Sequence, residues 1–334
     1  GLQLRVHRFD SVLSLHIMKI LVTGASGFIG YHLVKSLLKN DHRVIGIDNH
    51  NDYYDPALKE LRNKNNTSKN YELFKQDINN INLKKRDFDL AINLAAQAGV
   101  RIPKKNEYLY KHTNINGFKS FCNFCKNNNI NKIIYASSSS VYSDFNYEKF
   151  SETSKILEPK SEYGASKLSN EAYANKFAKK EGIKFIGLRF FTVYGPFGRP
   201  DMAYYSFTDS LKNNKKIFLN NNGKMLRDMT YIDDIIKGIM LAIDFIFKKS
   251  NEGRNEIFNL GNDSPISTKF LLETLENKLN TRANIEINFT SNELLRTHAD
   301  ISKAKNLLGY DPKISFNDGI KEFLIWHKTY YENK

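Results

Sequence analysis

The sequence has few of the features that mark secreted, membrane-spanning or disordered proteins. Only two of its 334 residues are cysteine and one is tryptophan, so a disulfide-stapled scaffold is excluded. No stretch approaches about 18 uninterrupted apolar residues, which excludes a transmembrane helix. Proline occurs seven times, and hydrophobic residues make up 41% of the chain, a share too high for a disordered protein. A chain of this length is expected to fold around a large apolar core.

The net charge is +14, but the basic residues form no concentrated patch along the chain. Lysine recurs with asparagine in loop after loop, as in 63–66 and 213–216. There is no basic helix and no arginine-rich tract interleaved with aromatic residues, so the sequence predicts no nucleic-acid partner. A positive surface keeps the protein soluble and attracts acidic small substrates such as nucleotides.

The first 17 residues differ from the rest of the chain. Residues 1–17 contain a weakly apolar stretch that is interrupted by Ser14 and His16, whereas a signal peptide has a continuous apolar region. We expect this segment to be an extension outside the fold, because Met18 leads directly into a buried run. No signal peptide and few cysteines together predict a cytoplasmic protein with no membrane partner.

From Met18 onward, short apolar runs alternate with segments of helix length. The apolar runs lie at 19–22, 43–47, 71–74, 90–94, 132–135 and 185–190. Segments such as 28–38 and 163–180, which lie between them, are expected to be helical. This alternation predicts an α/β fold: a Rossmann-type, doubly wound parallel sheet with its ligand at the carboxyl ends of the strands. The alternation loosens after Thr192, and a further run at 257–260 is expected to return to the sheet.

A glycine-rich motif after the first apolar run indicates a dinucleotide site. Gly24, Gly27 and Gly30 stand where a tight turn, close approach to a pyrophosphate and helix–strand packing require glycine. The helix that follows would offer free N–H groups to the phosphates. Asp48 closes the second apolar run, at the spacing of an acidic residue that binds the adenosine ribose, which favours NAD over NADP. The alternative is an ordinary turn, with Asp48 as a helix cap.

A second motif predicts catalysis. Tyr163 and Lys167 are four residues apart in a segment expected to be helical, so their side chains share one face. The pKa of a free tyrosine, about 10, makes it a poor base at neutral pH, but a neighbouring ammonium and a positive nicotinamide ring would lower that pKa. Four serines, 137–140, end an upstream apolar run and would lie at the ligand edge of the sheet. The alternative is a surface helix and a serine-rich loop.

Longer motifs extend these indications from about residue 18 to residue 310. They are GIDNHNDYYD (46–55), NLAAQAGVR (93–101), RFFTVYGPFGRPDMA (189–203) and GKMLRDMTYIDD (223–234). On these motifs the chain resembles the extended short-chain dehydrogenase/reductase family, and within it the NAD-dependent nucleotide-sugar 4-epimerases. The resemblance is closest to the UDP-glucuronate 4-epimerases.

The resemblance implies a set of site residues. Those expected to bind NAD are Gly24, Gly27, Phe28, Ile29, Gly30, Asp48, Asn49, Asp77, Ile78, Leu94, Ala95, Ala96, Asn114, Tyr163, Lys167 and Phe190. Tyr163 is the expected base, with Lys167 and Ser138 as its catalytic partners. Those expected to bind substrate are Ser138, Ser139, Ser140, Thr192, Arg199, Met202, Arg227 and Asp300.

Two arginines are given particular roles in this set. Arg227 would pair with the diphosphate and Arg199 with a glucuronate carboxylate, since the guanidinium fork suits both. The alternative for Arg199 is an ion pair with the nearby Asp201. The segment 292–300 is a divergent version of one that binds the nucleotide in the family, which leaves the role of Asp300 open.

The implied reaction is reversible epimerisation at C4 of a UDP-sugar through a 4-keto intermediate, with tightly bound NAD. UDP-glucuronate and UDP-galacturonate are the expected pair. Ser139 and Ser140 stand where family 4,6-dehydratases have an acidic pair and decarboxylases a glutamate, which favours epimerisation alone. The alternatives are a 4-epimerase of UDP-glucose/UDP-galactose or of UDP-N-acetylhexosamines, and a non-catalytic NAD-binding protein.

The same resemblance implies that the chain is divided into two parts with different ligands. We expect an NAD-binding domain over 18–191 plus 229–262, and a nucleotide-sugar-binding lobe over 192–228 plus 263–330. A homodimer would form through 106–128 and 163–180.

Cys122 and Cys125 have the spacing of a redox or zinc motif, but zinc needs four ligands, so we expect no metal and two half-buried cysteines in a helix that begins near residue 116.

Overall fold

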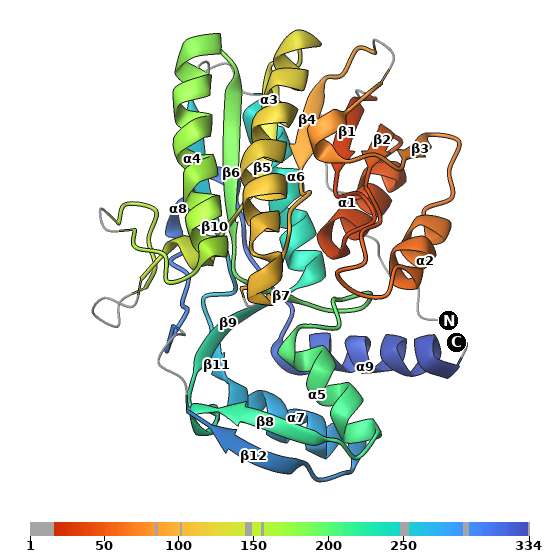
Figure 1. Cartoon of the computed structure of the whole chain (residues 1–334), viewed down its shortest axis with the longest axis vertical. Coiled ribbons are helices and arrows are strands. Elements are labelled where there is room, and N and C mark those ends of the chain that lie inside the picture. The colour runs from red at the N-terminus through yellow and green to blue at the C-terminus, as the bar shows by residue number, and fades with distance from the viewer. Residues whose placement is uncertain are drawn as a thin grey trace.

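A seven-stranded parallel sheet with helices on both faces forms the larger part of the molecule, and a smaller lobe lies below it (Figure 1). The structure is a computed structural model that describes residues 17–83, 86–100, 102–143, 149–154, 157–247, 254–289 and 294–332. The strands of the sheet are β1 (Lys19–Thr23), β2 (Arg43–Ile47), β3 (Tyr71–Phe74), β4 (Leu90–Asn93), β5 (Lys132–Ser138), β6 (Lys184–Phe190) and β10 (Asn255–Leu260). Their order is β10-β6-β5-β4-β1-β2-β3.

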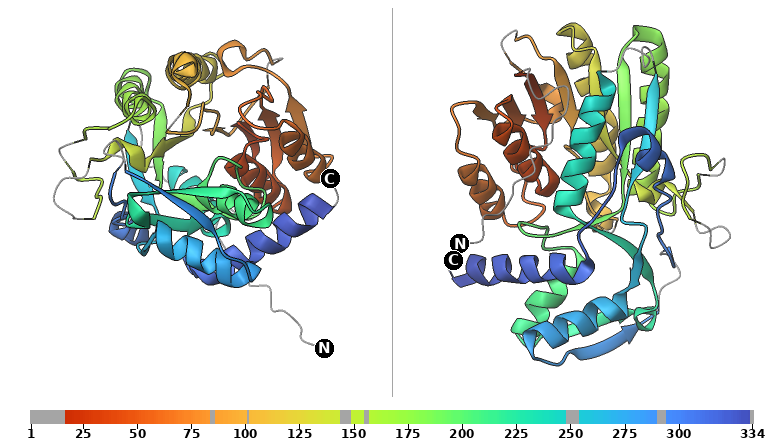
Figure 2. Two further views of the ribbon diagram at one scale, coloured as in Figure 1. Left: turned by 60° about the horizontal axis from the view of Figure 1, so that its bottom comes forward. Right: turned by 180° about the vertical axis from the view of Figure 1, so that it is seen from behind.

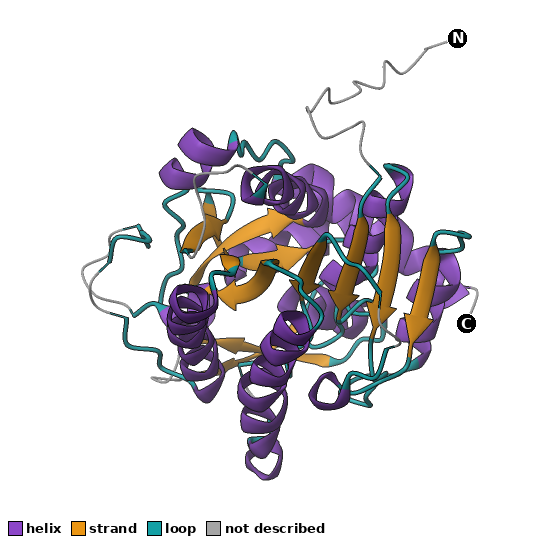
Figure 3. Cartoon of the chain, turned by 90° about the horizontal axis from the view of Figure 1, so that it is seen from above, coloured by secondary structure: helices purple, strands orange, loops and turns teal. Residues whose placement is uncertain are grey.

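Burial explains why these runs become strands. Every residue of β4 and of β6 is buried, as expected for parallel strands covered on both faces. α1 (Phe28–Lys39) and α6 (Ile232–Ile246) pack on one face, and α3 (Phe118–Asn127) and α4 (Glu162–Glu181) on the other (Figure 2). Figure 3 shows helices on both sides of the sheet. Two apolar cores follow, one on each side of the sheet. The predicted doubly wound α/β fold is confirmed.

Two elements differ from the sequence prediction by more than two residues. β5 continues three residues past Tyr135, because Ala136, Ser137 and Ser138 pair with Leu188–Phe190 of β6. The helix expected from about residue 116 begins earlier, as the π-helix η3 (Tyr110–Gly117), which leads into α3. π-Helical turns are uncommon and often lie at functional sites.

The lobe contains two small sheets and several helices. One sheet has the order β11-β9-β7, from β7 (Thr192–Tyr194), β9 (Leu226–Tyr231) and β11 (Pro265–Ser267), and the other pairs β8 (Lys216–Asn220) with β12 (Asn284–Asn288). The further helices of the chain are α2 (Ala57–Asn65), α5 (Ala203–Lys212), α7 (Thr268–Leu279), α8 (Ser302–Leu308) and α9 (Phe316–Glu332). Short helical turns are η1 (Ile78–Asn80), η2 (Lys104–Asn106), η4 (Ser139–Val141) and η5 (Asn221–Gly223).

Both cysteines lie in α3 and are completely buried, not half-buried as predicted. Burial raises the pKa of each thiol, which makes both inert in nucleophilic chemistry.

In the described ranges no group of three or more His, Cys, Asp or Glu side chains could hold a metal ion. Within the same ranges, no helix combines the length and apolar character needed to span a membrane. The predicted extension 1–17 lies outside the described residues except for Ile17.

Candidate active site

A cleft runs along the carboxyl ends of β1, β2, β4, β5 and β6, which is where parallel sheets bind their ligands. Of the residues predicted to bind NAD, those that line it are Gly24, Gly27, Phe28, Ile29, Gly30, Asp48, Asn49, Ile78, Leu94, Ala95, Ala96, Tyr163, Lys167 and Phe190. Of those predicted to bind substrate, Ser138, Ser139, Ser140, Thr192, Arg199 and Met202 line it too.

The glycine-rich loop has the shape of a pyrophosphate cradle. Gly24 has φ +70°, and a Cβ there would lie 2.7 Å from the backbone nitrogen of Ala95. A Cβ at Gly30 would lie 2.0 Å from the carbonyl oxygen of Gly24. Gly27 is the N-cap residue of α1, and no side chain caps the first turn of that helix, so the N–H groups of the turn can bind an anion. The loop therefore fits the dinucleotide predicted from the sequence.

Asp48 follows the end of β2 and is fixed by two main-chain bonds. Its Oδ2 accepts from the Ser26 N–H at 3.1 Å and its Oδ1 from the His50 N–H at 2.9 Å. Each carboxylate oxygen has two lone pairs, so both can still accept a hydroxyl. The carboxylate is thus oriented and suits the two hydroxyls of a ribose.

Two predicted cofactor residues, Asp77 and Asn114, do not line the cleft but support its wall. Asn114, on η3, accepts from the Gln97 N–H at 2.7 Å and donates to the Gln97 carbonyl at 3.2 Å. Asp77 caps η1 and accepts from Asn49 Nδ2 at 3.2 Å. Both therefore contact lining residues, Gln97 and Asn49, a distinction that residue type and spacing do not reveal.

Tyr163, Lys167 and Ser138 meet where α4 approaches the end of β5. The Lys167 Nζ lies 5.7 Å from the centre of the Tyr163 ring and donates to the Ala136 carbonyl at 2.9 Å. The Ser138 side chain acts on the Tyr163 hydroxyl and lowers the pKa of that phenol. Lys167 is only 2% exposed, and burial lowers its pKa to about 8. Its ammonium is therefore close to titrating under physiological conditions.

The groups of the protein itself hold the pKa of Tyr163 above that of a free tyrosine, whereas the sequence prediction invoked both Lys167 and a positive nicotinamide ring. Burial of the phenol is the largest influence and raises its pKa, and the charge of Arg199 and the hydrogen bond with Ser138 oppose that rise. The reason is physical: a buried site penalises the phenolate and the ammonium alike. The geometry of the tyrosine–lysine pair is as predicted, but the protein alone does not create a low-pKa tyrosine.

The charge of Lys167 predicts a pH effect on catalysis. As pH rises through about 8, the site loses this ammonium and with it part of the stabilisation of a Tyr163 phenolate. We expect kcat to fall above about pH 8. In Lys167→Arg, whose guanidinium stays charged, kcat should be lower but should not fall over the same range. A pH–kcat profile of both proteins tests this, and identical alkaline limbs would contradict it.

A buried ion pair holds the end of β5 beside the catalytic groups. Ser137 donates to Glu171 Oε1 at 2.5 Å, and Arg189 binds both oxygens of Glu171, at 2.8 and 2.7 Å. Arg189 also donates to the Tyr142 hydroxyl at 2.7 Å. Glu171 lies one helical turn after Lys167 on α4, so one network links the helix that carries Tyr163 and Lys167 to the strand that carries the serines.

A wider cleft of about 1140 Å³ adjoins the first one and extends into the lobe. Ser139, Ser140, Thr192, Arg199 and Met202 line both. Arg227, on β9, lines only the wider cleft, as a diphosphate ligand on the nucleotide side would. Together the two clefts form a continuous surface from the glycine-rich loop to the lobe.

Asp300 lies apart from both clefts. Its Oδ1 accepts from the Ser302 N–H at 2.9 Å, so the carboxylate caps the start of α8. Its main chain bonds to Phe150 and Asn259. The structure thus separates Asp300 from the predicted substrate contacts, because its carboxylate binds the first N–H of the helix that follows it. Residues 292 and 293 of the same divergent segment lie outside the described residues.

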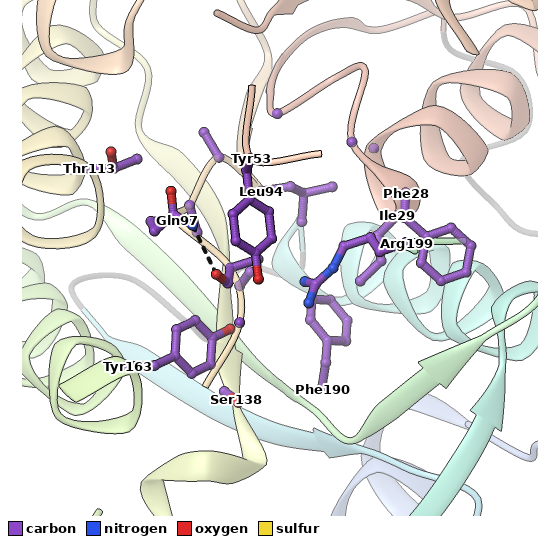
Figure 4. A pocket seen from close by; sticks show the side chains of 18 of the residues that line it. Phe28, Ile29, Tyr53, Leu94, Gln97, Thr113, Ser138, Tyr163, Phe190 and Arg199 are labelled. Carbon is purple, nitrogen blue, oxygen red and sulfur yellow. Dashed lines mark hydrogen bonds between the residues drawn. The ribbon is translucent and has the colours of Figure 1, made fainter. Parts of the chain in front are cut away.

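Arg199 points into the first cleft with Tyr53 and Tyr163 (Figure 4). It also makes the ion pair that the sequence left open: Nε and one terminal nitrogen donate to Asp201 at 3.0 and 2.7 Å. Burial disfavours its charge, but Asp201 outweighs burial and raises its pKa. Asp201 uses two of the five N–H groups of the guanidinium, and Nη2 also donates to Met202 Sδ at 3.7 Å. The two N–H groups of Nη1 can therefore still bind a carboxylate.

Tyr53 is a lining residue that the sequence analysis did not assign. Its hydroxyl donates to Asp201 Oδ2 at 3.1 Å, which joins the loop after β2 to the loop after β7. Burial is the main cause that raises the pKa of this phenol, and Asp201 adds to it. The residue belongs to a quoted motif, but a partner 148 positions away leaves no local trace in the sequence.

These features are a parallel sheet with a glycine-rich loop after β1, a carboxylate oriented at the end of β2, and a tyrosine, a lysine and a serine gathered at the end of β5. Together they define a dinucleotide-dependent enzyme of the short-chain dehydrogenase/reductase type. The chain belongs to the NAD dependent epimerase/dehydratase family, whose profile matches residues 20–261.

Known relatives extend this similarity over nearly the whole chain. UDP-glucuronate 4-epimerase 4 of Arabidopsis thaliana is 40% identical over 330 residues, which cover 93% of this chain and 76% of the plant protein. An uncharacterized protein of Methanocaldococcus jannaschii is 44% identical over 94% of this chain and 97% of its own length. The crystal structure of Bacillus cereus UDP-glucuronic acid 4-epimerase with UDP-glucuronic acid and NAD superimposes with a TM-score of 0.88. It is 35% identical and covers 94% of this chain and 100% of its own.

Proposed function

We propose that the protein is an NAD-dependent UDP-sugar 4-epimerase that interconverts UDP-glucuronate and UDP-galacturonate. The observation that carries this proposal is the surroundings of Tyr163: a guanidinium, Arg199, in the same cleft, and only hydroxyl side chains at the end of β5. The cation suits an acidic sugar. A strand end without a carboxylate lacks the group that would drive elimination of water. The plant and bacterial relatives at 40% and 35% identity support the same activity.

In this mechanism Tyr163 accepts the proton of the sugar 4-hydroxyl, and Ser138 hydrogen-bonds the oxygen as it becomes a carbonyl. Lys167, whose ammonium is buried close to the tyrosine ring, stabilises the phenolate. Bound NAD supplies a reversible hydride acceptor at C4, and because the hydride is returned, the cofactor is not consumed. The 4-keto sugar turns over within the cleft, so that the hydride returns to its other face and Tyr163 returns the proton.

The residues that hold the two ligands follow from the two clefts. The glycine-rich loop binds the pyrophosphate of NAD and Asp48 its adenosine ribose, while Phe190 lines the end near Tyr163. Arg227 binds the diphosphate of the UDP-sugar from the wider cleft. Thr192 and Met202 line both clefts and contact the sugar between them.

Arg199 controls the fate of the intermediate. A 4-keto glucuronate is a β-keto acid: when its C5–C6 bond breaks, CO₂ leaves and the enolate that remains takes up a proton to give a 4-keto pentose. We expect Arg199→Ala to raise the ratio of pentose product to epimer by about tenfold, since the carboxylate loses its charged partner. Arg282→Ala, at a side chain that is 83% exposed, is the control. A product ratio that stays at the wild-type value would show that Arg199 does not bind the sugar carboxylate.

A single assay tests the proposed function. Purified protein is incubated with UDP-glucuronate and no added NAD, and the sugar proton signals are followed by NMR. UDP-galacturonate should appear, which would establish both the acidic substrate and a retained cofactor.

A neutral sugar is the second candidate, since Asp201 already binds one edge of Arg199. Conversion of UDP-glucose or UDP-N-acetylglucosamine, without UDP-glucuronate turnover, would favour it. Bound NAD without turnover of any of these sugars would indicate a non-catalytic protein.

The proposal includes the division of the chain and its assembly. Residues 18–191 plus 229–262 bind NAD, and 192–228 plus 263–330 bind the nucleotide sugar. Two copies associate through 106–128 and 163–180, a homodimer that light scattering would detect as twice the 38.6 kDa chain mass. Two free cysteines suit a reducing compartment such as the cytoplasm.

A further inference from the structure

Arg62, on α2, is a cation buried away from both clefts. It is completely inaccessible to solvent. Its partners in the described structure are the carbonyls of Ser26, Phe197 and Gly198 and the hydroxyl of Tyr54. All five N–H groups of the guanidinium are used in these bonds, at 2.5–3.1 Å. Burying a charge that no carboxylate neutralises costs free energy. We therefore expect this arginine to do more than fill space in the core.

The carbonyls that Arg62 binds belong to two loops that face the two ligands. Ser26 lies in the glycine-rich loop, next to Gly27 at the start of α1. Phe197 and Gly198 immediately precede Arg199. One terminal nitrogen donates to Ser26 at 3.1 Å, and the other donates to Phe197 at 2.6 Å and Gly198 at 3.1 Å. A single planar group thus sets the spacing between the cofactor loop and the loop that carries Arg199.

His32, on α1, binds the carbonyl just before these two. Its Nε2 lies 2.9 Å from the Pro196 oxygen, so this nitrogen must carry the proton. Three consecutive carbonyls, at 196, 197 and 198, are therefore bound by side chains of the larger domain. Phe197 has φ +57°, an unfavourable conformation for a bulky residue, which persists only where its surroundings impose it.

We propose that Arg62, assisted by His32, is a positioning residue that fixes Arg199 relative to the cofactor loop and so determines how the sugar carboxylate is held. This inference rests on the proposed function for its catalytic consequence. Lysine cannot replace the residue, because an ammonium has three donors and no planar fork with which to join both loops.

The first test measures the product ratio. Arg62→Lys should raise the ratio of 4-keto pentose to UDP-galacturonate by about tenfold, as expected when a catalytic group shifts by a fraction of an ångström, while bound NAD is retained. This ratio does not depend on how much of the enzyme is folded. The control is Arg86→Lys. Arg86 forms an ion pair with Glu72, a residue of β3. A ratio within twofold of the wild-type value would overturn the proposal.

The second test needs no activity. Hydrogen–deuterium exchange of the peptide 195–201 should be at least tenfold faster in Arg62→Lys than in Arg86→Lys, and unchanged exchange would overturn the positioning role. If Arg62→Lys fails to fold, His32→Phe serves instead, since it keeps a ring against Tyr31 and Phe197 and removes only the donor to Pro196. An inactive wild-type protein would contradict the proposed function, whereas exchange would still decide the role of Arg62.

Discussion

Tyr163→Phe is expected to lower the rate of epimerisation by about 10³-fold, within the range observed when a general acid–base is removed. The substitution deletes one oxygen from a ring that is held by its position on α4, so the ring should stay in the cleft. The KM for UDP-glucuronate should change little, and the NAD content should equal that of the wild type. Initial rates by NMR and release of NAD on denaturation provide both measurements.

The matched control is Tyr173→Phe, the same change on the same helix. Tyr173 stacks on Phe177 at a centroid distance of 5.4 Å, outside both clefts. A wild-type rate in Tyr163→Phe would exclude this residue as the base. Equal losses in both variants would show that the effect comes from helix packing and not from proton transfer.

Gly30→Ala is expected to abolish NAD retention and to lower the free energy of unfolding by about 3 kcal/mol, the upper end for an overpacked site. The new methyl group would lie 2.0 Å from the carbonyl oxygen of Gly24 and 3.0 Å from the Cα of Ala25. Both atoms belong to the main chain, so neither can turn aside as a side chain would. The loop must move away from α1, and the cradle opens.

Gly182→Ala is the control for this change. Gly182 caps α4 with φ +70°, and no atom lies within 4 Å of a Cβ built there. Only the backbone preference is lost, at about 1 kcal/mol, and NAD should stay bound. Chromatography of the released nucleotide and thermal unfolding test both variants. Retention of NAD in Gly30→Ala would contradict the proposal that the glycine-rich loop binds its pyrophosphate.

The sequence predicts the sheet well, because buried parallel strands are nearly continuous apolar runs. β2 and β3 have the predicted bounds. The extension of β5 was missed because Ser137 and Ser138 are polar, and only their pairing with β6 makes them part of a strand. The π-helix that begins at Tyr110 was missed for a related reason: periodicity predicts a helix but not its hydrogen-bond spacing.

The site was predictable where function depends on short spacing along the chain. Gly24 to Gly30 and Tyr163 to Lys167 form local motifs, and the structure brings them to one cleft. Arg62 could not be found in this way, since its partner Phe197 is 135 residues distant. Asp300 shows the reverse error. Its residue type is compatible with a ligand contact, but its carboxylate instead binds the N–H of Ser302 at the start of α8.

The single tryptophan of the chain, Trp326 on α9, lies 5.0 Å from the ring of Phe197 and 5.3 Å from that of Tyr330. Phe197 stands two residues before Arg199, so the indole contacts the loop that faces the sugar. Because the chain has one tryptophan, tryptophan emission reports on the surroundings of Trp326, which include this loop and the neighbouring rings of α5 and α9. Ligand arrival can be followed by emission without an attached dye, and a stopped-flow trace would separate movement of the loop from the chemical step.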